Sequence, residues 1–186
     1  MQFNRHSNQE GQHSVLSASQ YAWIRYSDGK FIETMGNRLQ AMKGTQLHEF
    51  AAMAIRLGQK APRSHTTMNM YINDAIGFRM TPELVLYYSP NAFCTVDAIS
   101  FKNGMLRIHD LKTGVGKVNV NQLEIYAAYF CLEYNVRPGE IDIELRIYQN
   151  DEVQVFIPDT NDIVNIMGTV VKFDNIYEDM KAELFG

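Results

Sequence analysis

The stretch FKNGMLRIHDLKTG, residues 101–114, indicates the fold and raises a chemical question. Asn103-Gly104 is a strong signal for a two-residue hairpin, because both residues tolerate the positive φ angles of a type I′ turn. An alternating strand follows the turn, and Asp110 and Lys112 stand at its end. A core strand gains nothing from an acid and an ammonium group on its inward side, so these two residues call for a functional explanation.

The turn also predicts which residues of the two strands face each other. With a two-residue loop, Asp97 faces Asp110 and Thr95 faces Lys112, all on one face because the strand period is two. Directly opposed β-carbons are about 4.5–5.5 Å apart, where like charges destabilise a sheet unless one is protonated or a cation lies between them. Mg²⁺ and Mn²⁺ prefer such oxygen ligands. The alternatives are an edge hairpin whose charged residues face water, and a β-bulge that shifts the register by one residue.

We therefore expect a metal site at the open end of the hairpin. Asp97 and Asp110 would hold the ion, and the Leu111 carbonyl would add a ligand. Lys112 would orient or deprotonate a water, or stabilise the charge that develops on a phosphoryl group. His109 is adjacent to Asp110 and is expected to face the opposite side of the sheet, so it is excluded as a ligand.

Hydrophobic periodicity predicts an α/β (α+β) fold with helices on the faces of a central sheet. The first part of the chain is expected to pack through two apolar sets, one near Trp23 and one at three- and four-residue intervals over 37–58. These sets are Tyr21, Trp23 and Ile24, and Leu39, Met42, Leu47, Phe50, Ala54 and Leu57. The expected parts are a flexible arm (1–13) and one domain (14–186), itself made of a mainly helical part (14–80), a sheet core (81–158) with a helix (119–135), and a C-terminal helix (160–184).

Composition is that of a globular protein, with 46% apolar and 20% charged residues among 186. No apolar run reaches the roughly 20 residues of a membrane span, and the polar N-terminus lacks a signal core, so we expect a cytoplasmic protein without membrane contact. Cys94 and Cys131 are the only cysteines, which excludes a four-cysteine metal site within this chain. Residues 1–65 carry eight basic against four acidic residues, whereas residues 118–186 carry four against thirteen.

The segments VDAISFKNGMLRIHDLKTG (96–114) and QLEIY (122–126) together resemble the PD-(D/E)XK nuclease superfamily, in its RecB-like branch of phage and bacterial exonucleases. The resemblance spans roughly residues 14–130, and it implies a restriction-endonuclease-like core. It also implies further site residues: a metal-binding His48 from KGTQLHEFA and a strand Glu83 from PELVLYY, which would bind the ion through water or bind a second ion. Gln122 and Tyr126 would lie on one helical face and position the substrate and the lysine.

Two features limit or qualify the resemblance. The family often has glycine three residues before the first aspartate, where this chain has Cys94, which places the close backbone approach of that glycine in doubt. His48, Glu83, Gln122 and Tyr126 each also have an ordinary structural interpretation, as a buried hydrogen-bonded histidine, a strand-edge acid, a surface amide and a core aromatic.

The resemblance implies a Mg²⁺- or Mn²⁺-dependent deoxyribonuclease with one or two ions, and it points to an exonuclease in phage or bacterial recombination or repair. Its partners would be DNA ends or single-stranded regions, with an annealing protein or a helicase as a protein partner, and a homo-oligomer is left open. One alternative is a non-catalytic DNA-binding or interaction module that keeps the nuclease fold. Another is RNA or a modified nucleic acid as substrate.

Overall fold

The protein, analysed as a computed structural model, forms two compact units, residues 1–43 and 44–186. The structure describes residues 5–9, 11–12 and 14–185. The boundary between the units falls inside the helix α1 (Asp28–Leu57). Part of the predicted arm (1–13) lies outside the described residues, and the single domain expected from residue 14 onward stays a prediction.

The first unit contains short helical segments that expose most of their apolar side chains. They are η1 (Ser7–Gln9), η2 (Ala18–Arg25) and the first part of α1. The expectation that Tyr21 and Ile24 anchor a helix is wrong, because they are 65% and 70% exposed. Trp23 is partly buried, and its indole N–H donates to the carbonyl of Ser17 over 3.0 Å.

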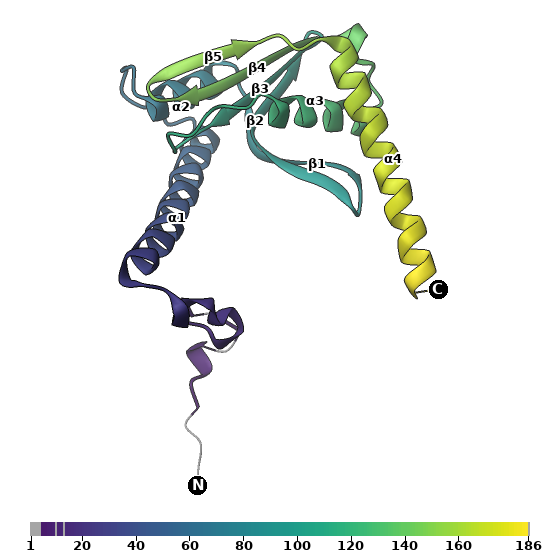
Figure 1. The fold of residues 1–186 in the computed structure, drawn as a ribbon. Coiled ribbons are helices and arrows are strands. Elements are labelled where there is room, and N and C mark those ends of the chain that lie inside the picture. The colour runs from purple at the N-terminus through teal and green to yellow at the C-terminus, as the bar shows by residue number, and fades with distance from the viewer. Residues whose placement is uncertain (1–4, 10, 13, 186) are drawn as a thin grey trace. The chain divides into compact units, whose positions relative to one another are not determined.

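The second unit is built on a five-stranded mixed sheet with helices on both faces (Figure 1). Its strands lie in chain order: β1 (Thr81–Ser89), β2 (Ala92–Lys102), β3 (Met105–Leu111), β4 (Asp142–Gln149) and β5 (Glu152–Phe156). Neighbouring strands are antiparallel except β3 and β4, which are parallel. The predicted α+β sheet flanked by helices, with a helical region before it, is confirmed at this level.

The parallel pair β3–β4 needs a crossover, and α3 (Asn121–Glu133) supplies it across one face of the sheet. The predicted inward residues of α3 are buried against β1 to β4: Leu123, Tyr126, Ala127 and Phe130. The last helix, α4 (Thr160–Phe185), packs on α3 through the buried Ile163 (Figure 1). In its C-terminal half, Asp174 and Glu178 accept hydrogen bonds from Asn91 in the turn between β1 and β2. Among the described residues, no helix is long and apolar enough to span a membrane.

The opposite face of the sheet is covered by α2 (Thr67–Gly77) and by the end of α1. In α2 the predicted Tyr71, Ile72 and Ala75 are buried. In α1 the predicted inward side is mostly wrong, because Leu39, Met42, Phe50 and Leu57 are 59–70% exposed. Ala54 of the predicted set is buried, but the other buried residues of α1 are Ala51, Ala52 and Ile55, which the prediction did not include. Small alanine side chains let a helix approach the sheet closely, so the contact face of α1 is not the face with the largest apolar residues.

The predicted hairpin register is confirmed for five pairs, from Lys102 with Met105 to Ala98 with His109. Asn103 and Gly104 form the turn with φ angles of 51° and 76°, as a type I′ turn requires. The regular pairing ends at Ala98 and His109. Asp97 and Asp110 thus lie immediately beyond the last regular pair.

Candidate functional site

The strand β2 loses its regular pairing at Asp97. Val96 pairs with Leu84 and Ala98 pairs with Pro82, but Asp97 has no paired residue in β1 or β3. Val96 packs in the apolar cluster around α3, whereas Ala98 packs in the cluster with α1 and α2. Residues two apart share a face in a regular strand, so β2 changes face at Asp97. Asp97 stays partly exposed between two buried residues.

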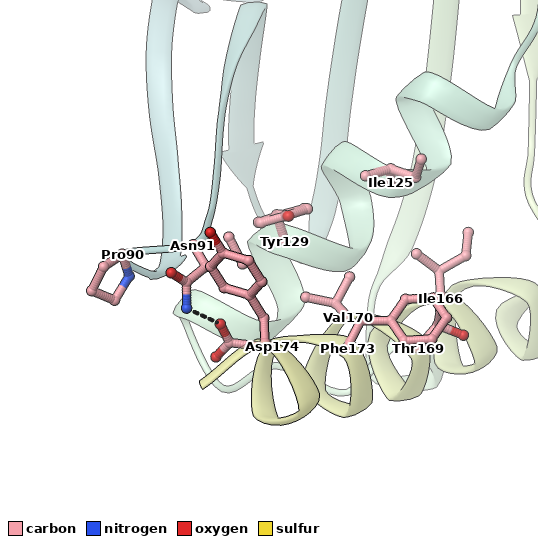
Figure 2. A pocket seen from close by; sticks show the side chains of 11 residues that line it. Pro90, Asn91, Ile125, Tyr129, Ile166, Thr169, Val170, Phe173 and Asp174 are labelled. Carbon is pink, nitrogen blue, oxygen red and sulfur yellow. Dashed lines mark hydrogen bonds between the residues drawn. The ribbon is translucent and has the colours of Figure 1, made fainter. Parts of the chain in front are cut away.

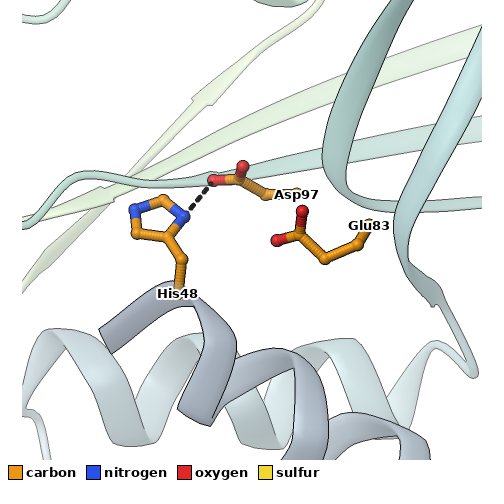
Figure 3. Close-up of side chains that lie close together, drawn as sticks. All are labelled: His48, Glu83 and Asp97. Atoms are coloured by element: carbon orange, nitrogen blue, oxygen red, sulfur yellow. Dashed lines mark ion pairs between the residues drawn. The ribbon is translucent and has the colours of Figure 1, made fainter. Parts of the chain in front are cut away.

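Glu83 lies across from this irregularity in β1. Its backbone is left-handed, with φ of 51°, although its neighbours Pro82 and Leu84 pair regularly with β2. For a residue with a β-carbon this conformation costs about 1–2 kcal/mol, and such strain is concentrated at functional sites. The Glu83 carboxylate lies beside the side chain of Asp97 (Figure 3).

His48 reaches the same point from α1. Its Nδ1 lies 3.3 Å from Oδ2 of Asp97, and ligand atoms of His48, Glu83 and Asp97 all lie within 4.8 Å of one another (Figure 3). These three residues are far apart in the chain and come from three elements. Their arrangement offers one nitrogen and two carboxylates, a donor set that suits a divalent cation.

The protonation equilibria of this group reflect its concentrated negative charge. The hydrogen bond to Asp97 raises the pKa of His48, against the opposing effect of burial. Burial raises the pKa of Glu83, and the nearby Asp97 carboxylate adds to the rise. A bound cation would stabilise the ionised carboxylates and so offset this repulsion.

Asp110 is the buried carboxylate of a second group. Its side chain is 2% exposed, and Lys112 Nζ lies 2.9 Å from Oδ2 and 3.1 Å from Oδ1. The hydrogen bond is directed at Oδ1, so Oδ2 has an ion-pair partner but no well-directed donor. Burial raises the pKa of Asp110, and the charge of Asp97 raises it further, while Lys112 lowers it. The two aspartates are therefore close enough to interact.

Gln122 and Tyr126 of α3 extend this group as a hydrogen-bonded chain. Lys112 Nζ donates to Oε1 of Gln122 over 2.8 Å, and Gln122 Nε2 donates to the Tyr126 hydroxyl over 2.6 Å. The amide is thus fixed at both ends and holds the ammonium in place. Burial raises the pKa of Tyr126 to about 12, which keeps its hydroxyl protonated and free to donate.

Asp97 joins the two groups. The same Oδ2 that contacts His48 accepts a hydrogen bond of 2.9 Å from the backbone N–H of Leu111, next to Asp110. The amide of Leu111 therefore has an assigned role, whereas its carbonyl as a metal ligand stays a prediction. The structure brings His48, Glu83 and Asp97 together at one end, and the Asp110–Lys112 pair at the other.

A cleft of about 630 Å³ opens beside His48 and Glu83. Its wall is one face of α1 from Thr45 to Leu57, and Arg56 lies in it. Sequence reasoning missed Arg56, although its position eight residues after His48 places it on the same helical face. The Arg56 side chain is close enough to Glu83 for its charge to act on that carboxyl group.

A second cavity, of about 700 Å³, lies between α3 and α4 and is more apolar (Figure 2). Its lining includes Tyr129, Val170 and Phe173, and its polar groups Asn91 and Asp174 are hydrogen-bonded to each other over 2.8 Å. It contains no group of converging ionisable residues, so the candidate site is the one around Asp97.

His109 faces the side of the sheet away from Lys112, as predicted from its place in the strand. The Tyr148 hydroxyl donates to Asp74 over 2.7 Å, and it lies 3.2 Å from His109 Nδ1. Because the tyrosine proton is given to Asp74, His109 Nδ1 must be the donor in its contact with Tyr148. Nε2 of this fully buried ring then has no hydrogen-bond partner.

Comparisons with known proteins found no matching family model, no matching curated protein and no matching solved structure.

Proposed function

We propose that the chain is a metal-dependent deoxyribonuclease that hydrolyses phosphodiester bonds. The observation that carries the proposal is the position of Asp97 between two groups of polar side chains. On one side His48 and Glu83 converge on it, and on the other the Leu111 amide ties it to the buried Asp110. A fold gains no stability from two acids gathered beside a buried third, so the arrangement calls for a cation.

The residues present fit such an ion. His48, Glu83 and Asp97 supply close nitrogen and oxygen donors, and Asp110 adds a buried oxygen without a well-directed donor. Mg²⁺ and Mn²⁺ accept this set, with Mn²⁺ more tolerant of the imidazole. When bound, the ion would polarise a phosphoryl oxygen and make a nearby water more acidic.

The side chains of the second group have separable roles. Lys112 is held by Asp110 and Gln122, so its ammonium is ready to stabilise the negative charge that builds on the phosphoryl group. Gln122 sets the direction of Lys112 through an amide that is fixed at both ends. Tyr126 keeps its proton and can donate it to a substrate oxygen or a water. Because these partners are in place beforehand, little reorganisation is needed during the reaction.

DNA as the substrate, and its ends as the preferred place of attack, rest on the resemblance to RecB-like exonucleases. The charge distribution supports a polyanion at the N-terminal side, because basic residues exceed acidic ones over residues 1–65. The role in phage or bacterial recombination, an annealing protein or helicase as partner, and a cytoplasmic location belong to the same proposal.

To test the proposal, the purified chain is incubated with linear and circular DNA in Mg²⁺, in Mn²⁺ and in EDTA, and cleavage of the DNA is measured. We expect cutting in at least one metal and none in EDTA, and loss of linear DNA alone would identify an exonuclease. Lys112→Ala should lower the rate by about 100-fold or more. Lys172→Ala, a lysine of α4 outside the site, is the matched control and should cut at the normal rate. A folded protein that cuts neither DNA in either metal overturns the proposal.

A further inference from the structure

The segment that connects β3 to α3, residues 112–120, presents one apolar side chain to solvent. Val115 is 90% exposed, whereas Val118 and Val120 of the same segment are partly buried against the core. Exposure of a single valine is ordinary by itself. Here the backbone around Val115 is anchored on both sides, which gives the exposure a structural cause.

The anchor is Gln149, the last residue of β4, which is only 7% exposed. Its Nε2 donates to the carbonyl of Gly114 over 2.5 Å and to the carbonyl of Gly116 over 3.0 Å. An amide NH₂ group has two donors, and both are used on the residues that flank Val115. The two hydrogen bonds hold the backbone on either side of Val115 against Gln149, and the Val115 side chain between them is exposed to solvent.

The base of this segment belongs to the candidate site. Lys112 begins it, and Gln122, which holds Lys112, follows its end. Thr113 Oγ1 lies 3.0 Å from the position that a β-carbon on Gly44 would take, and Gly44 is one helical turn before His48 in α1. Val115 is thus carried by a segment that begins in the lysine group and passes close to the helix of the candidate metal ligand.

The charge of the segment favours an anionic partner. Residues 111–123 contain two lysines and no acidic residue, in a chain whose net charge is −4. Lys112 is paired with Asp110, and Lys117 is exposed to solvent. A polyanion is favoured beside such a segment, and apolar side chains next to phosphate-binding residues contact the faces of unstacked bases.

We propose that Val115 packs against the terminal base of a DNA strand and helps to separate it from its partner base, while Lys117 contacts the backbone phosphates. This inference rests on the proposed function and gives that function a substrate preference, a duplex end that must fray. Gln149 acts as a positioning residue, because its hydrogen bonds to Gly114 and Gly116 determine the position of Val115 and it does not itself contact the DNA.

The test uses duplex DNA with 2-aminopurine at its terminal pair, whose fluorescence rises when the base unstacks. The full chain carries Lys112→Ala, and Ca²⁺ replaces the catalytic metal, so that binding is read without cutting. We expect a fluorescence rise on binding that Val115→Ser reduces about fivefold, with duplex-end affinity lowered by up to about tenfold. Val155→Ser, at an exposed valine of the edge strand β5, is the matched control and should leave both unchanged.

The role of Gln149 is tested in the same assay. Gln149→Met keeps the side-chain length but removes both donors, and it should reduce the fluorescence rise while the chain still unfolds cooperatively. Combined with Val115→Ser it should cause little further loss, because both changes act on one contact. Independent, additive losses would overturn the positioning role.

In the cleavage-competent chain, Val115→Ser should slow cutting at a paired end about tenfold and cutting of a pre-frayed end less than twofold. A fluorescence rise that depends on Val115 in a chain that never cuts DNA supports this inference and overturns the proposed nuclease activity. If the chain cuts DNA and Val115→Ser slows cutting at neither kind of end, the nuclease activity is supported and this inference is overturned. A Val115→Ser chain with normal DNA behaviour but altered self-association would show that Val115 contacts protein, and would overturn the inference.

Discussion

At the scale of single residues, Glu83 and Asp97 mark the point where the sheet departs from regularity. Glu83 has a left-handed backbone, and Asp97 has no paired residue in either neighbouring strand. Each irregularity alone would weaken the sheet. At this point ligand atoms of Glu83, Asp97 and His48 lie within 4.8 Å of one another. The strain is therefore a property of the site.

Glycine should be better than alanine at residue 83, the reverse of a normal strand position. Glu83→Gly relieves the left-handed strain at an entropic cost of roughly 0.5–1 kcal/mol, so its free energy of unfolding should equal or exceed that of the wild type. Glu83→Ala should be less stable than Glu83→Gly by about 1 kcal/mol. Urea denaturation measures both. At the regular position Val85 in β1, the Val85→Gly variant should instead be less stable than Val85→Ala. If the alanine variant is the more stable of the two at both positions, the strain assigned to Glu83 is contradicted.

His109 should make the protein less stable in mild acid. Burial lowers its pKa to about 3, and the charges of Arg146 and Arg107 contribute, whereas an unfolded histidine titrates near 6.5. Between these values the unfolded chain binds the extra proton, so stability contributed by neutral His109 is present above pH 6.5 and is lost as the pH falls toward 3. The loss at pH 5 should be about 2 kcal/mol relative to pH 7.

The measurement compares urea denaturation at both pH values for the wild type, His109→Phe and His65→Phe. Phenylalanine at 109 keeps a ring against Phe78, which His109 meets edge-on at 5.6 Å, and Tyr148 still donates to Asp74. His109→Phe should therefore remove about 2 kcal/mol of the pH dependence. His65→Phe, a substitution at an exposed position, should leave the pH dependence of the free energy of unfolding as it is in the wild type. An equal pH dependence in all three chains would show that His109 is not held neutral.

The residues of the site were predictable to different extents. Asn103-Gly104 predicts the hairpin turn, and the register that follows from this turn places Asp97 and Asp110 at the open end. The left-handed backbone of Glu83 is not readable, because glutamate has no preference for that region and no neighbouring signal predicts it. The role of Gln149 was equally hidden, since it depends on two carbonyls more than 30 residues away in the chain.

At the scale of elements, the periodicity of the sequence located the helices and strands of the second unit but misjudged one contact face. Predicted helix 119–135 is α3 (Asn121–Glu133), and predicted helix 160–184 is α4 (Thr160–Phe185). In α1 the large apolar residues such as Phe50 suggested the wrong side, because three of the four buried residues of this helix are alanines. Side-chain size governs how closely a helix can approach the sheet, and hydrophobicity alone does not report it.

The closeness of α1 to the segment after β3 predicts opposite effects of two glycine substitutions. Gly168→Ala in α4 meets no atom within 4 Å, so it should stabilise by up to about 1 kcal/mol through helix propensity. At Gly44, a β-carbon would lie 3.0 Å from Thr113 Oγ1. Gly44→Ala should therefore gain less than Gly168→Ala or lose stability, and it should also disturb the segment that follows Lys112.

Thermal or urea unfolding of both variants provides the comparison, and Thr113→Ala supplies the control. Removing the hydroxyl removes the close contact, so Gly44→Ala should recover much of the helix-propensity gain in the Thr113→Ala background. Equal stabilisation by both glycine substitutions in the wild-type background would show that α1 and this segment are not in close contact.

At the scale of the whole molecule, the candidate ligands come from distant parts of the second unit. His48 lies in α1, Glu83 in β1 and Asp97 in β2, so an unfolded chain cannot offer them together. A cation that binds only the folded state stabilises it by an amount that grows with concentration. The first unit supplies none of these ligands, and none of its described residues is buried.

Mn²⁺ should therefore raise the free energy of unfolding, by about 2.7 kcal/mol at a concentration 100 times its dissociation constant. EDTA should reverse the gain, and His48→Ala should reduce it because imidazole is the nitrogen ligand of the set. His65→Ala, at an exposed histidine before α2, should respond as the wild type does. A chain that begins at Gly44 should keep the whole gain, since the core clusters and all the ligands lie within residues 44–186. Stabilisation that is identical in His48→Ala, or that disappears with residues 1–43, would place the cation elsewhere than at Asp97.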